Sequence, residues 1–458
     1  LGETSQATMI MTPAAAKNLA DNLYRNKIKA VLREYSNNAL DGHTAVGTPE
    51  RPFNVTLPSS LNPELSIRDF GPGLSHDFMM QNFTCYFYST KEQQVKQTGE
   101  LGLGSKAGHA YCDHFTAISR QGGEKRIYTL YKDDDWMPAI TLQTTLPTDE
   151  PDGFEIKIPV RASDITEFDA TARSLYTYFN PRPRITNVPN FTFVEPTYTT
   201  EGQGWKLRQV PRYHYDRPQA IMNNVCYPVQ YRDIPSLTDD EEMLLQCPLD
   251  LWFEPGELSF AMSREDLSYD RKTCEALKRR IAQVTLELPR KFASEVQAAE
   301  TLWDAKVLYH DRVRRNESIP HKLQEVLKES LTYRGHKLSA ATHLRSYQGE
   351  VALVADREFR LSRIQCDYRS HLHFTPTSNT VVIWDDLSDR RVPSTLMHNF
   401  WGGAVSVVVL RTNDPAVLQD MLNQLGNPPY ERLADLEKPP VASTKRANRT
   451  KPEMQKLY

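Results

Sequence analysis

Three polar residues recur at helical spacing in the segment REYSNNALDGH, which covers residues 33–43. Glu34, Asn38 and Asp41 stand at i, i+4 and i+7, so a helix places them in one stripe. A carboxylate in such a stripe can orient and deprotonate a water molecule, and an amide oxygen one turn further can bind magnesium, which prefers oxygen ligands. A solvated polar face without chemistry is the alternative, so the segment gains weight only in combination with other patterns in the chain.

A carboxylate followed by two glycines forms the second pattern, DFGPG at residues 69–73. It comes directly after the strand-like residues 65–68. A carboxylate at a strand end, here Asp69, can accept a hydrogen bond from the exocyclic amine of adenine. Gly71 and Gly73 let the backbone pass close to the base. An ordinary Gly-Pro turn is the alternative for this segment.

The third pattern, GELGLGSKAG at residues 99–108, contains four glycines in ten residues. A loop of this kind, followed by a helical pattern, can turn its amide groups toward a triphosphate, and Lys106 can add positive charge. The pattern departs from a P-loop because the lysine comes one place late and no Ser or Thr follows it. It departs from GxGxxG because the third glycine also comes one place late. A flexible linker is the alternative, and the flanking apolar residues argue against it.

A helix and several strands must position these patterns. Residues 17–43 are predicted to form one helix, with Ile28, Val31, Leu32, Tyr35 and Ala39 on its apolar face. The polar stripe borders that face, so it lies at the edge of the core, where a pocket can form. Strands are predicted around residues 65–69, 115–119, 126–131 and 154–158.

The rest of the chain divides at two predicted boundaries, one within residues 181–205 and one near residues 315–335. Between them, strands are predicted at 249–253 and 258–262, followed by a helix with its N-cap at Asp270. Beyond them, strands are predicted at 380–384 and 405–410, and a helix from Asp414 to Gly426. The segments predicted are residues 1–190, 191–320 and 321–436, with a basic flexible tail at 437–458. The fold class predicted is α+β.

Composition excludes several classes of function. The net charge of −3 over 458 residues gives no overall basic field for nucleic acid. The six cysteines form no CxxC pair, which indicates reduced thiols in a cytosol-like compartment. The longest apolar stretch, near residues 404–410, is far shorter than the ~20 residues of a membrane span. The first residues also lack the features of a signal peptide. We therefore expect any membrane contact to be peripheral.

The order and spacing of the three patterns resemble those of the GHKL (Bergerat-fold) ATPases. GELGLGSKAGHAYCDHFTAIS resembles the lid and following strand of Hsp90, and REYSNNALD resembles its magnesium helix. The chain resembles the rIIA lysis-inhibition proteins of T-even-like phages still more closely. The matching segments are LYRNKIKAVLREYSNNALDGH, IRDFGPGLS, FYSTKEQ with TGELGLGSKAGHAY, and GELSFAMSREDLSYDRKT, which span residues 23–273.

The resemblance implies roles for individual residues. Glu34 is expected to be the general base, Asn38 the magnesium ligand, Asp69 the adenine-reading carboxylate and Asp41 a support for the adenine side. Arg264, in a Ser-Arg-Glu segment like that of the Hsp90 middle domain, is expected to neutralise the terminal phosphate; a surface salt bridge with Glu265 or Asp266 is the alternative. The remaining nucleotide-lining residues are expected to be Gly71, Gly73, Gly99, Gly102, Leu103, Gly104, Ser105 and Lys106. Phe154 stands where Hsp90-like proteins have a threonine near adenine, so adenine selectivity is expected to be built differently.

The resemblance also implies the architecture and the activity. It predicts a GHKL α/β sandwich in residues 1–190, a middle or transducer-like domain in 191–320 and a further α/β domain in 321–436. It further implies that ATP and Mg²⁺ are the ligands, that hydrolysis is slow and coupled to conformational change or dimer closure, and that the process is lysis control or host interaction. An ATP-binding scaffold with little hydrolysis, and the ATPase subunit of a topoisomerase-like or Hsp90-like machine, remain alternatives.

The predicted partners are a second copy of the chain and a companion protein similar to rIIB. The predicted location is the host cytoplasm, with at most a peripheral contact with the inner membrane or nucleic acid. One further acidic pair, Asp385-Asp386, ends a predicted strand. It could bind a metal as in Toprim domains, but no companion glutamate motif precedes it, so a solvated turn is the favoured interpretation.

Overall fold

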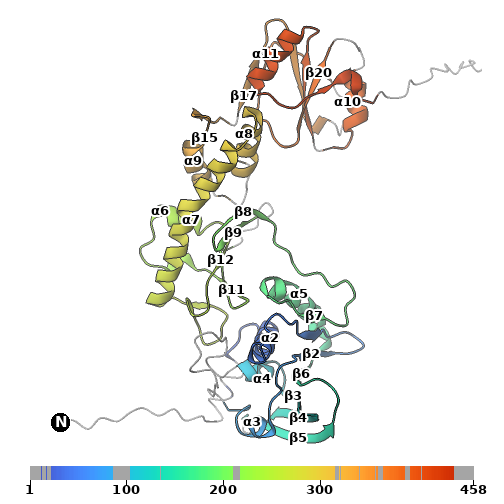
Figure 1. The fold of residues 1–458 in the computed structure, drawn as a ribbon, viewed down its shortest axis with the longest axis vertical. Helices are drawn as coiled ribbons and strands as arrows, with labels where there is room; N and C mark the ends of the chain where they lie inside the picture. The colour runs from blue at the N-terminus through green and yellow to red at the C-terminus, as the bar shows by residue number, and fades with distance from the viewer. Residues whose placement is uncertain are drawn as a thin grey trace, which may run out of the picture. The chain divides into compact units, whose positions relative to one another are not determined.

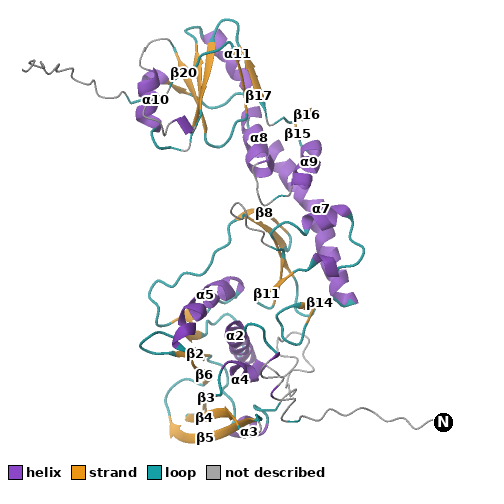
Figure 2. Cartoon of the chain, turned by 180° about the vertical axis from the view of Figure 1, so that it is seen from behind, coloured by secondary structure: helices purple, strands orange, loops and turns teal. Residues whose placement is uncertain are grey.

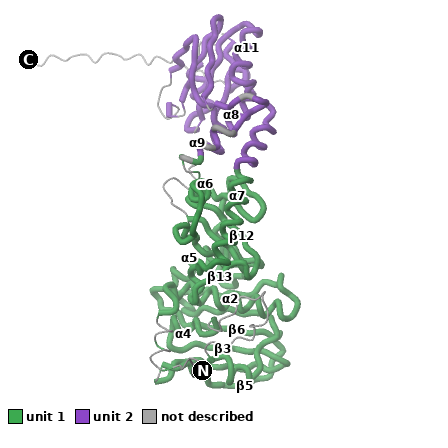
Figure 3. Tube along the Cα trace, turned by 90° about the vertical axis from the view of Figure 1, so that its left-hand side faces the viewer, with its two compact units in different colours: residues 1–288, 317–323 green, residues 289–316, 324–458 purple. Residues whose placement is uncertain are grey.

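The chain is a mixed α+β protein with several separate sheets. The computed structural model describes residues 12, 17, 22–85, 104–134, 136–209, 217–314, 319, 321–339, 341–355, 357–358, 365–386, 392–403 and 405–437. The chain divides into two compact units (Figure 3). Unit 1 comprises Leu1–Leu288 with Glu317–Leu323, and unit 2 comprises Pro289–Asn316 with Gln324–Tyr458.

A seven-stranded sheet with strand order β5-β4-β3-β6-β2-β1-β7 forms the first part of unit 1. The helices α2, α4 and α5 cover one face of this sheet, and their apolar side chains share one core with it (Figure 1). The strands are β1 (Asn54–Thr56), β2 (Glu64–Arg68), β3 (His114–Gln121), β4 (Glu124–Lys132), β5 (Pro138–Pro147), β6 (Gly153–Pro159) and β7 (Arg184–Ile185). The helices are α2 (Lys27–Ala45), α3 (His76–Gln81), α4 (Ala107–Tyr111) and α5 (Ile165–Leu175), with the turn η1 (Gly104–Lys106) before α4.

Helix α2 carries the predicted polar stripe, and its apolar face is buried as expected from the periodicity. Ile28, Val31 and Leu32 are each at most 6% exposed. The predicted start at residue 17 is wrong, because residues 23–26 are not helical. Asn26 is the N-cap: its side-chain oxygen accepts a hydrogen bond from the Lys29 amide at 2.8 Å, which satisfies one of the free amides of the first turn.

A five-stranded sheet with strand order β11-β10-β12-β9-β8 forms the second part of unit 1. Its strands are β8 (Tyr198–Gly202), β9 (Trp205–Arg208), β10 (Gln219–Met222), β11 (Val225–Pro228) and β12 (Leu249–Trp252). A short hairpin of β13 (Ser259–Phe260) and β14 (Leu267–Ser268) follows, with α6 (Asp239–Leu244) before β12. The turn between β13 and β14 contains Arg264.

The long helix α7 (Arg271–Gln297) begins as the sequence predicts. The Asp270 carboxylate accepts a hydrogen bond from the Thr273 amide at 2.8 Å, so Asp270 caps the first turn. The predicted apolar stripe is fully buried in the structure; its members are Leu277, Ile281, Val284 and Leu288. Pro289 lies inside the helix, and the division between the two units falls just before it.

Unit 2 is built on a four-stranded sheet with strand order β18-β21-β20-β22. Two hydrophobic cores lie on its two faces, one with α11 and one with α10 (Figure 2). The elements are α8 (Leu302–Tyr309), α9 (His321–Ser330), β15 (Thr332–Tyr333), β16 (His336–Lys337), β17 (Thr342–Arg345), β18 (Glu350–Val354), β19 (His371–Phe374), β20 (Thr380–Asp385), α10 (Val392–Phe400), β21 (Ser406–Arg411), α11 (Pro415–Leu425) and β22 (Glu431–Arg432).

Helix α11 has the two ends that the sequence predicts. The Asp414 side chain accepts from the Ala416 amide at 2.8 Å, and Pro415 occupies the first turn. Gly426 ends the helix in the left-handed conformation with φ 96°. Of the predicted basic tail, residues 438–458 lie outside the described residues.

Among the described residues, no helix combines the length and the apolar character needed to cross a bilayer. All six cysteines are free thiols in the structure.

Candidate functional site

The Glu34 carboxylate is the centre of a buried charge cluster in unit 1. It is 2% exposed, although it stands on the polar stripe of α2. Its Oε1 accepts hydrogen bonds from Arg33 Nη2 at 2.8 Å and Arg33 Nε at 3.0 Å. Its Oε2 lies 3.3 Å from Arg264 Nη1. Two guanidinium groups therefore compensate one carboxylate that has lost nearly all of its contact with water.

Arg33 also holds the segment that contains Arg264. Its guanidinium donates to the carbonyl of Ser263 at 2.8 Å and to the carbonyl of Arg264. Arg264 is a non-glycine residue with φ +54°, a conformation that costs an L-residue about 1–2 kcal/mol. The interactions that offset this strain include the Arg33 contacts, the pair with Glu34 and the hydrogen bond from the Arg264 amide to the Ala261 carbonyl at 2.8 Å.

Glu265 and Asp266 contact the start of α2 instead of Arg264. The Glu265 carboxylate accepts from the backbone amides of Arg25 at 2.9 Å and Asn26 at 2.8 Å, and the Arg25 guanidinium pairs with Asp266. Arg264 is 7% exposed and forms its ion pair with Glu34. The alternative of a surface salt bridge between Arg264 and its two acidic neighbours is therefore not the arrangement that the structure has.

The described end of the glycine-rich pattern lies directly against Glu34. A Cβ added at Gly104 would stand 2.7 Å from Glu34 Oε2, so only glycine fits there without moving the carboxylate. The Tyr35 hydroxyl donates to the Ser105 carbonyl at 3.0 Å and accepts from the Gly108 amide at 2.9 Å. These bonds hold η1 and the start of α4 on α2.

Lys106, in the same turn, is 7% exposed, and burial lowers the pKa of its ammonium group to about 8. At pH 7 the Lys106 ammonium group is therefore still mostly protonated, although its buried surroundings solvate the charge poorly. A nearby anion would favour the charged form. The predicted residues Gly99, Gly102 and Leu103 lie outside the described residues.

Asp69 is buried at the end of β2, and only one of its two carboxylate oxygens is engaged by the described chain. Its Oδ1 accepts from the Gly71 amide at 2.8 Å and the Phe154 amide at 3.0 Å. Within the described residues, no hydrogen bond reaches Oδ2. Burial raises the pKa of this carboxyl to about 6, against the opposing effect of those two amides. Oδ2 is thus an acceptor available to an incoming donor.

The two glycines after Asp69 permit two close approaches of its loop, at Gly71 to the C-terminal half of α2 and at Gly73 to β3. A Cβ at Gly71 would lie 2.8 Å from the backbone of Gly42, and one at Gly73, with φ +69°, would lie 2.3 Å from the Arg120 carbonyl oxygen. His43 adds a further tie, because its Nε2 accepts from the Phe70 amide at 2.8 Å. The loop is therefore fixed against the helix that carries Glu34.

Asn38 and Asp41 occupy the same stripe of α2 and are half-buried. The Asn38 side chain makes no hydrogen bond to any described residue, so its amide oxygen is available to a ligand. Among the described residues, no group of three or more His, Cys, Asp or Glu side chains is arranged to hold a metal ion.

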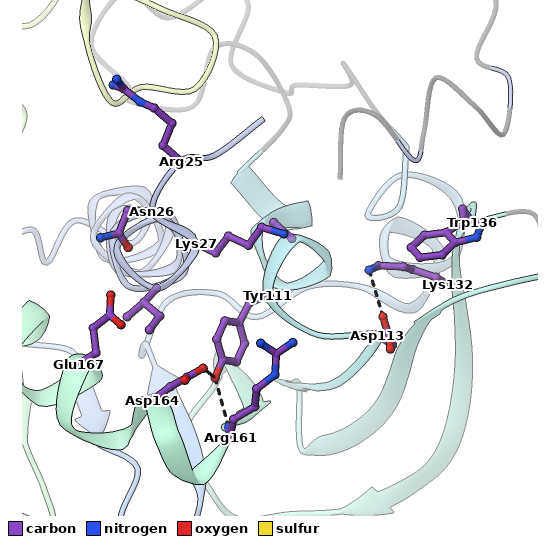
Figure 4. Close-up of a pocket in the computed structure, with 12 residues that line it drawn as sticks. Arg25, Asn26, Lys27, Tyr111, Asp113, Lys132, Trp136, Arg161, Asp164 and Glu167 are labelled. Atoms are coloured by element: carbon purple, nitrogen blue, oxygen red, sulfur yellow. Dashed lines mark hydrogen bonds and ion pairs between the residues drawn. The ribbon is translucent and has the colours of Figure 1, made fainter. Parts of the chain in front are cut away.

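A cavity of about 420 Å³ lies at the start of α2, and it contains none of the predicted site residues (Figure 4). Its walls include Lys27 from α2, Tyr111 from α4 and Arg161 before α5. Several of its polar groups contact each other: Lys132 pairs with Asp113 at 3.2 Å, and the Tyr111 hydroxyl donates to Asp164 at 2.7 Å. The cavity mixes charges of both signs, so its chemistry does not select a phosphate.

The acidic pair at the end of β20 is not a solvated turn, so that interpretation is wrong. Asp385 is fully buried; it accepts from Arg411 Nε at 2.7 Å and from the Tyr368 hydroxyl at 3.2 Å. Asp386 accepts from Arg432 at 2.6 Å. Both carboxylates are compensated by arginines, which gives them a structural role within unit 2.

Sequence reasoning missed the contributions of Arg33, His43 and the Phe154 amide. Arg33 and His43 are the first and last residues of the segment that carries Glu34. Their place in that segment could have indicated that they belong to the site. Phe154 was noted only for lacking a threonine side chain, whereas its backbone amide is the group that contacts Asp69. A backbone donor leaves no trace in side-chain patterns.

Comparison with known proteins adds no family assignment. No protein-family model matches the chain, and no curated protein matches it.

Proposed function

We propose that the first part of this chain binds ATP with Mg²⁺ as a GHKL-type ATPase and hydrolyses it slowly. The observation that carries the proposal is the ion pair between Glu34 on α2 and Arg264, which is 230 residues away in the chain, at 3.3 Å. A general base and a cation that meets developing phosphate charge must converge on the same point, and these two groups do.

Asp69 supports the adenine end of the proposed site. Its Oδ1 is held by two backbone amides, so Oδ2 has a fixed direction and is available to an exocyclic amine. A buried acceptor of this kind discriminates strongly, because a ligand without the matching donor leaves it unpaired. The close packing of Gly71 on Gly42 keeps this acceptor beside α2, with Asp41 on the same helix.

Asn38, Gly104 and Lys106 support the phosphate end. Mg²⁺ commonly uses one or two protein oxygens together with water and phosphate, so the amide oxygen of Asn38 suffices as its protein ligand. Lys106 is a buried cation in the turn that abuts Glu34, and a triphosphate would stabilise its charge. Ser105 lies in the same turn. The finer architecture, a GHKL sandwich followed by a transducer-like domain and a C-terminal α/β domain, belongs to this proposal.

The charge cluster also gives a physical reason for slow turnover. Both carboxylate oxygens of Glu34 are engaged by guanidinium groups, so a water molecule would have to displace one of them before it could donate its proton to Glu34. The terminal phosphate of ATP would compete with Glu34 for Arg264. ATP binding would then rearrange the Ser263–Asp266 segment, which is how the nucleotide state would reach the second sheet of unit 1 and favour closure of a dimer.

The biological setting is proposed from the resemblance to the rIIA proteins. It comprises lysis control or host interaction, with a second copy of the chain and a companion similar to rIIB as partners. The location proposed is the host cytoplasm, with at most a peripheral contact with the inner membrane.

A nucleotide-dependent scaffold that binds ATP and hardly hydrolyses it is the second candidate function. The double pairing of Glu34 favours that candidate, because it holds the proposed base in an inactive state.

Turnover and binding measured together test the proposal. Glu34→Gln should abolish ATP hydrolysis while calorimetric titration still detects Mg-ATP binding, because a general base acts in the chemical step. Glu265→Gln is the matched control, since it alters the same interface without touching Glu34. Far-UV circular dichroism checks the fold of each variant. Hydrolysis at the parent rate by Glu34→Gln would refute the assigned base, and failure of the parent to bind ATP would refute the function.

A further inference from the structure

A pair of exposed histidines faces outward from the two-stranded sheet of β17 and β19 in unit 2. Strands β17 and β19 are antiparallel, and their register sets His343 opposite His373 and Arg345 opposite His371. All four side chains are exposed. The centroids of the His343 and His373 rings are 4.1 Å apart.

The hydrogen-bonding pattern explains why these rings are so close. One step beyond the pair of Arg345 and His371, the Ser346 amide donates to the Ser370 carbonyl at 2.8 Å, which marks a hydrogen-bonded position of the ladder. Hydrogen-bonded and non-hydrogen-bonded pairs alternate along an antiparallel ladder, so His343 and His373 form a non-hydrogen-bonded pair. Side chains in such pairs stand closer together than in hydrogen-bonded pairs.

The backbone beneath the two histidines is fixed by packing on the other face. Leu344 and Phe374 point inward and join the core that contains Leu418 and Leu422 of α11. The pair of strands β17 and β19 therefore presents its histidines from a packed support, and bringing both ring nitrogens to one ion requires only side-chain rotation.

We propose that His343 and His373 chelate a divalent transition metal ion through one nitrogen of each imidazole. Neutral imidazole suits Zn²⁺, Cu²⁺ and Ni²⁺, whereas Mg²⁺ prefers oxygen ligands. No third protein ligand completes the set within the described part of the chain, so water or another molecule fills the remaining positions. Both histidines belong to unit 2, whereas the residues of the proposed nucleotide site belong to unit 1.

Titration of the tag-free, full-length chain with Ni²⁺ in a non-coordinating buffer tests this proposal. We expect saturable binding that excess imidazole reverses. His343→Ala and His373→Ala should each weaken it by about tenfold or more, since even indirect partners of a metal ligand change affinity by that much. His371→Ala is the matched control on the same face and should bind as the parent does.

Three results would overturn the assignment: no binding by the parent, unchanged binding after either His343→Ala or His373→Ala, or an equal loss in His371→Ala. All three histidines are exposed on the strand surface, so none of the variants removes a core contact. Circular dichroism verifies that each variant is folded, and the result does not depend on whether the protein binds ATP.

Discussion

Replacement of Arg264 tests the buried charge cluster most directly, because the structure predicts both a stability and a rate effect. Arg264→Ala removes a buried guanidinium that pairs with Glu34 at 3.3 Å and lies 5.1 Å from the centroid of the Phe260 ring. A hydrogen bond to a charged group contributes about 1.5–3 kcal/mol, and a cation–π contact adds about 0.5–1 kcal/mol. Glu34 keeps its bonds to Arg33, so the full penalty of an unpaired buried charge does not apply.

We therefore expect Arg264→Ala to lower the free energy of unfolding of unit 1 by about 2–4 kcal/mol. Arg264→Gly separates the side chain from the backbone. It deletes the same guanidinium but relieves the strain at φ +54°, so it should be about 1 kcal/mol more stable than Arg264→Ala. Urea denaturation followed by circular dichroism, with hydrogen exchange in residues 258–270 as a local probe, measures both differences.

The rate effect concerns the proposed hydrolysis. Arg264→Ala should lower turnover much more than ATP affinity, because the charge that the guanidinium meets grows in the transition state. Asp266→Asn is the control: Asp266 pairs with the mostly exposed Arg25 at the same interface, so its loss should alter stability by at most about 1 kcal/mol. The assigned role of Arg264 is refuted if Arg264→Ala behaves like Asp266→Asn in stability, exchange and turnover.

Three further predictions concern single residues of unit 1. Adenine-nucleotide affinity should fall between pH 7.5 and 5, because Asp69 becomes protonated below its pKa of about 6 and is then a poorer acceptor; calorimetry should find this dependence weakened in Asp69→Asn. Gly104→Ala should slow ATP turnover more than Ser105→Ala does, since its Cβ would stand 2.7 Å from Glu34 Oε2; equal rates would contradict the close approach. Burial lowers the pKa of His109 to about 4, so the folded state resists protonation of this ring, and stability should be lost as pH falls from about 6.5 toward 4. Between pH 7.5 and 5 this loss amounts to about 2 kcal/mol, and urea titrations at those two pH values should find it removed in His109→Leu.

The elements with local signals could be predicted from the sequence alone. The apolar periodicity of α2 and α7, the strands β2, β3, β4 and β6, and both ends of α11 follow from spacing and capping chemistry within a few residues. Local signals also failed in places. The predicted start of the first helix overran the cap at Asn26, and β5, an edge strand with mostly half-buried or exposed positions, was not predicted.

Local sequence signals also indicated only part of the candidate site. Spacing alone put Glu34, Asn38 and Asp41 on one stripe, and the DFGPG pattern after a strand indicated Asp69. Arg264 was suggested only by the resemblance to GHKL proteins. Periodicity carries no information on which residues meet across 230 positions of chain, and it does not distinguish a solvated carboxylate from a buried one.

The environments of the charged groups depend on the folded chain as a whole. Folding made Glu34 a buried carboxylate between two arginines and buried Asp385 against Arg411 where a solvated turn was predicted. The physical reason is that the cost of burying a charge depends on every group that the fold brings within a few ångströms, most of them distant in the sequence. Residue types and their order indicated the candidate groups, and long-range packing set which of their atoms remain available to a ligand.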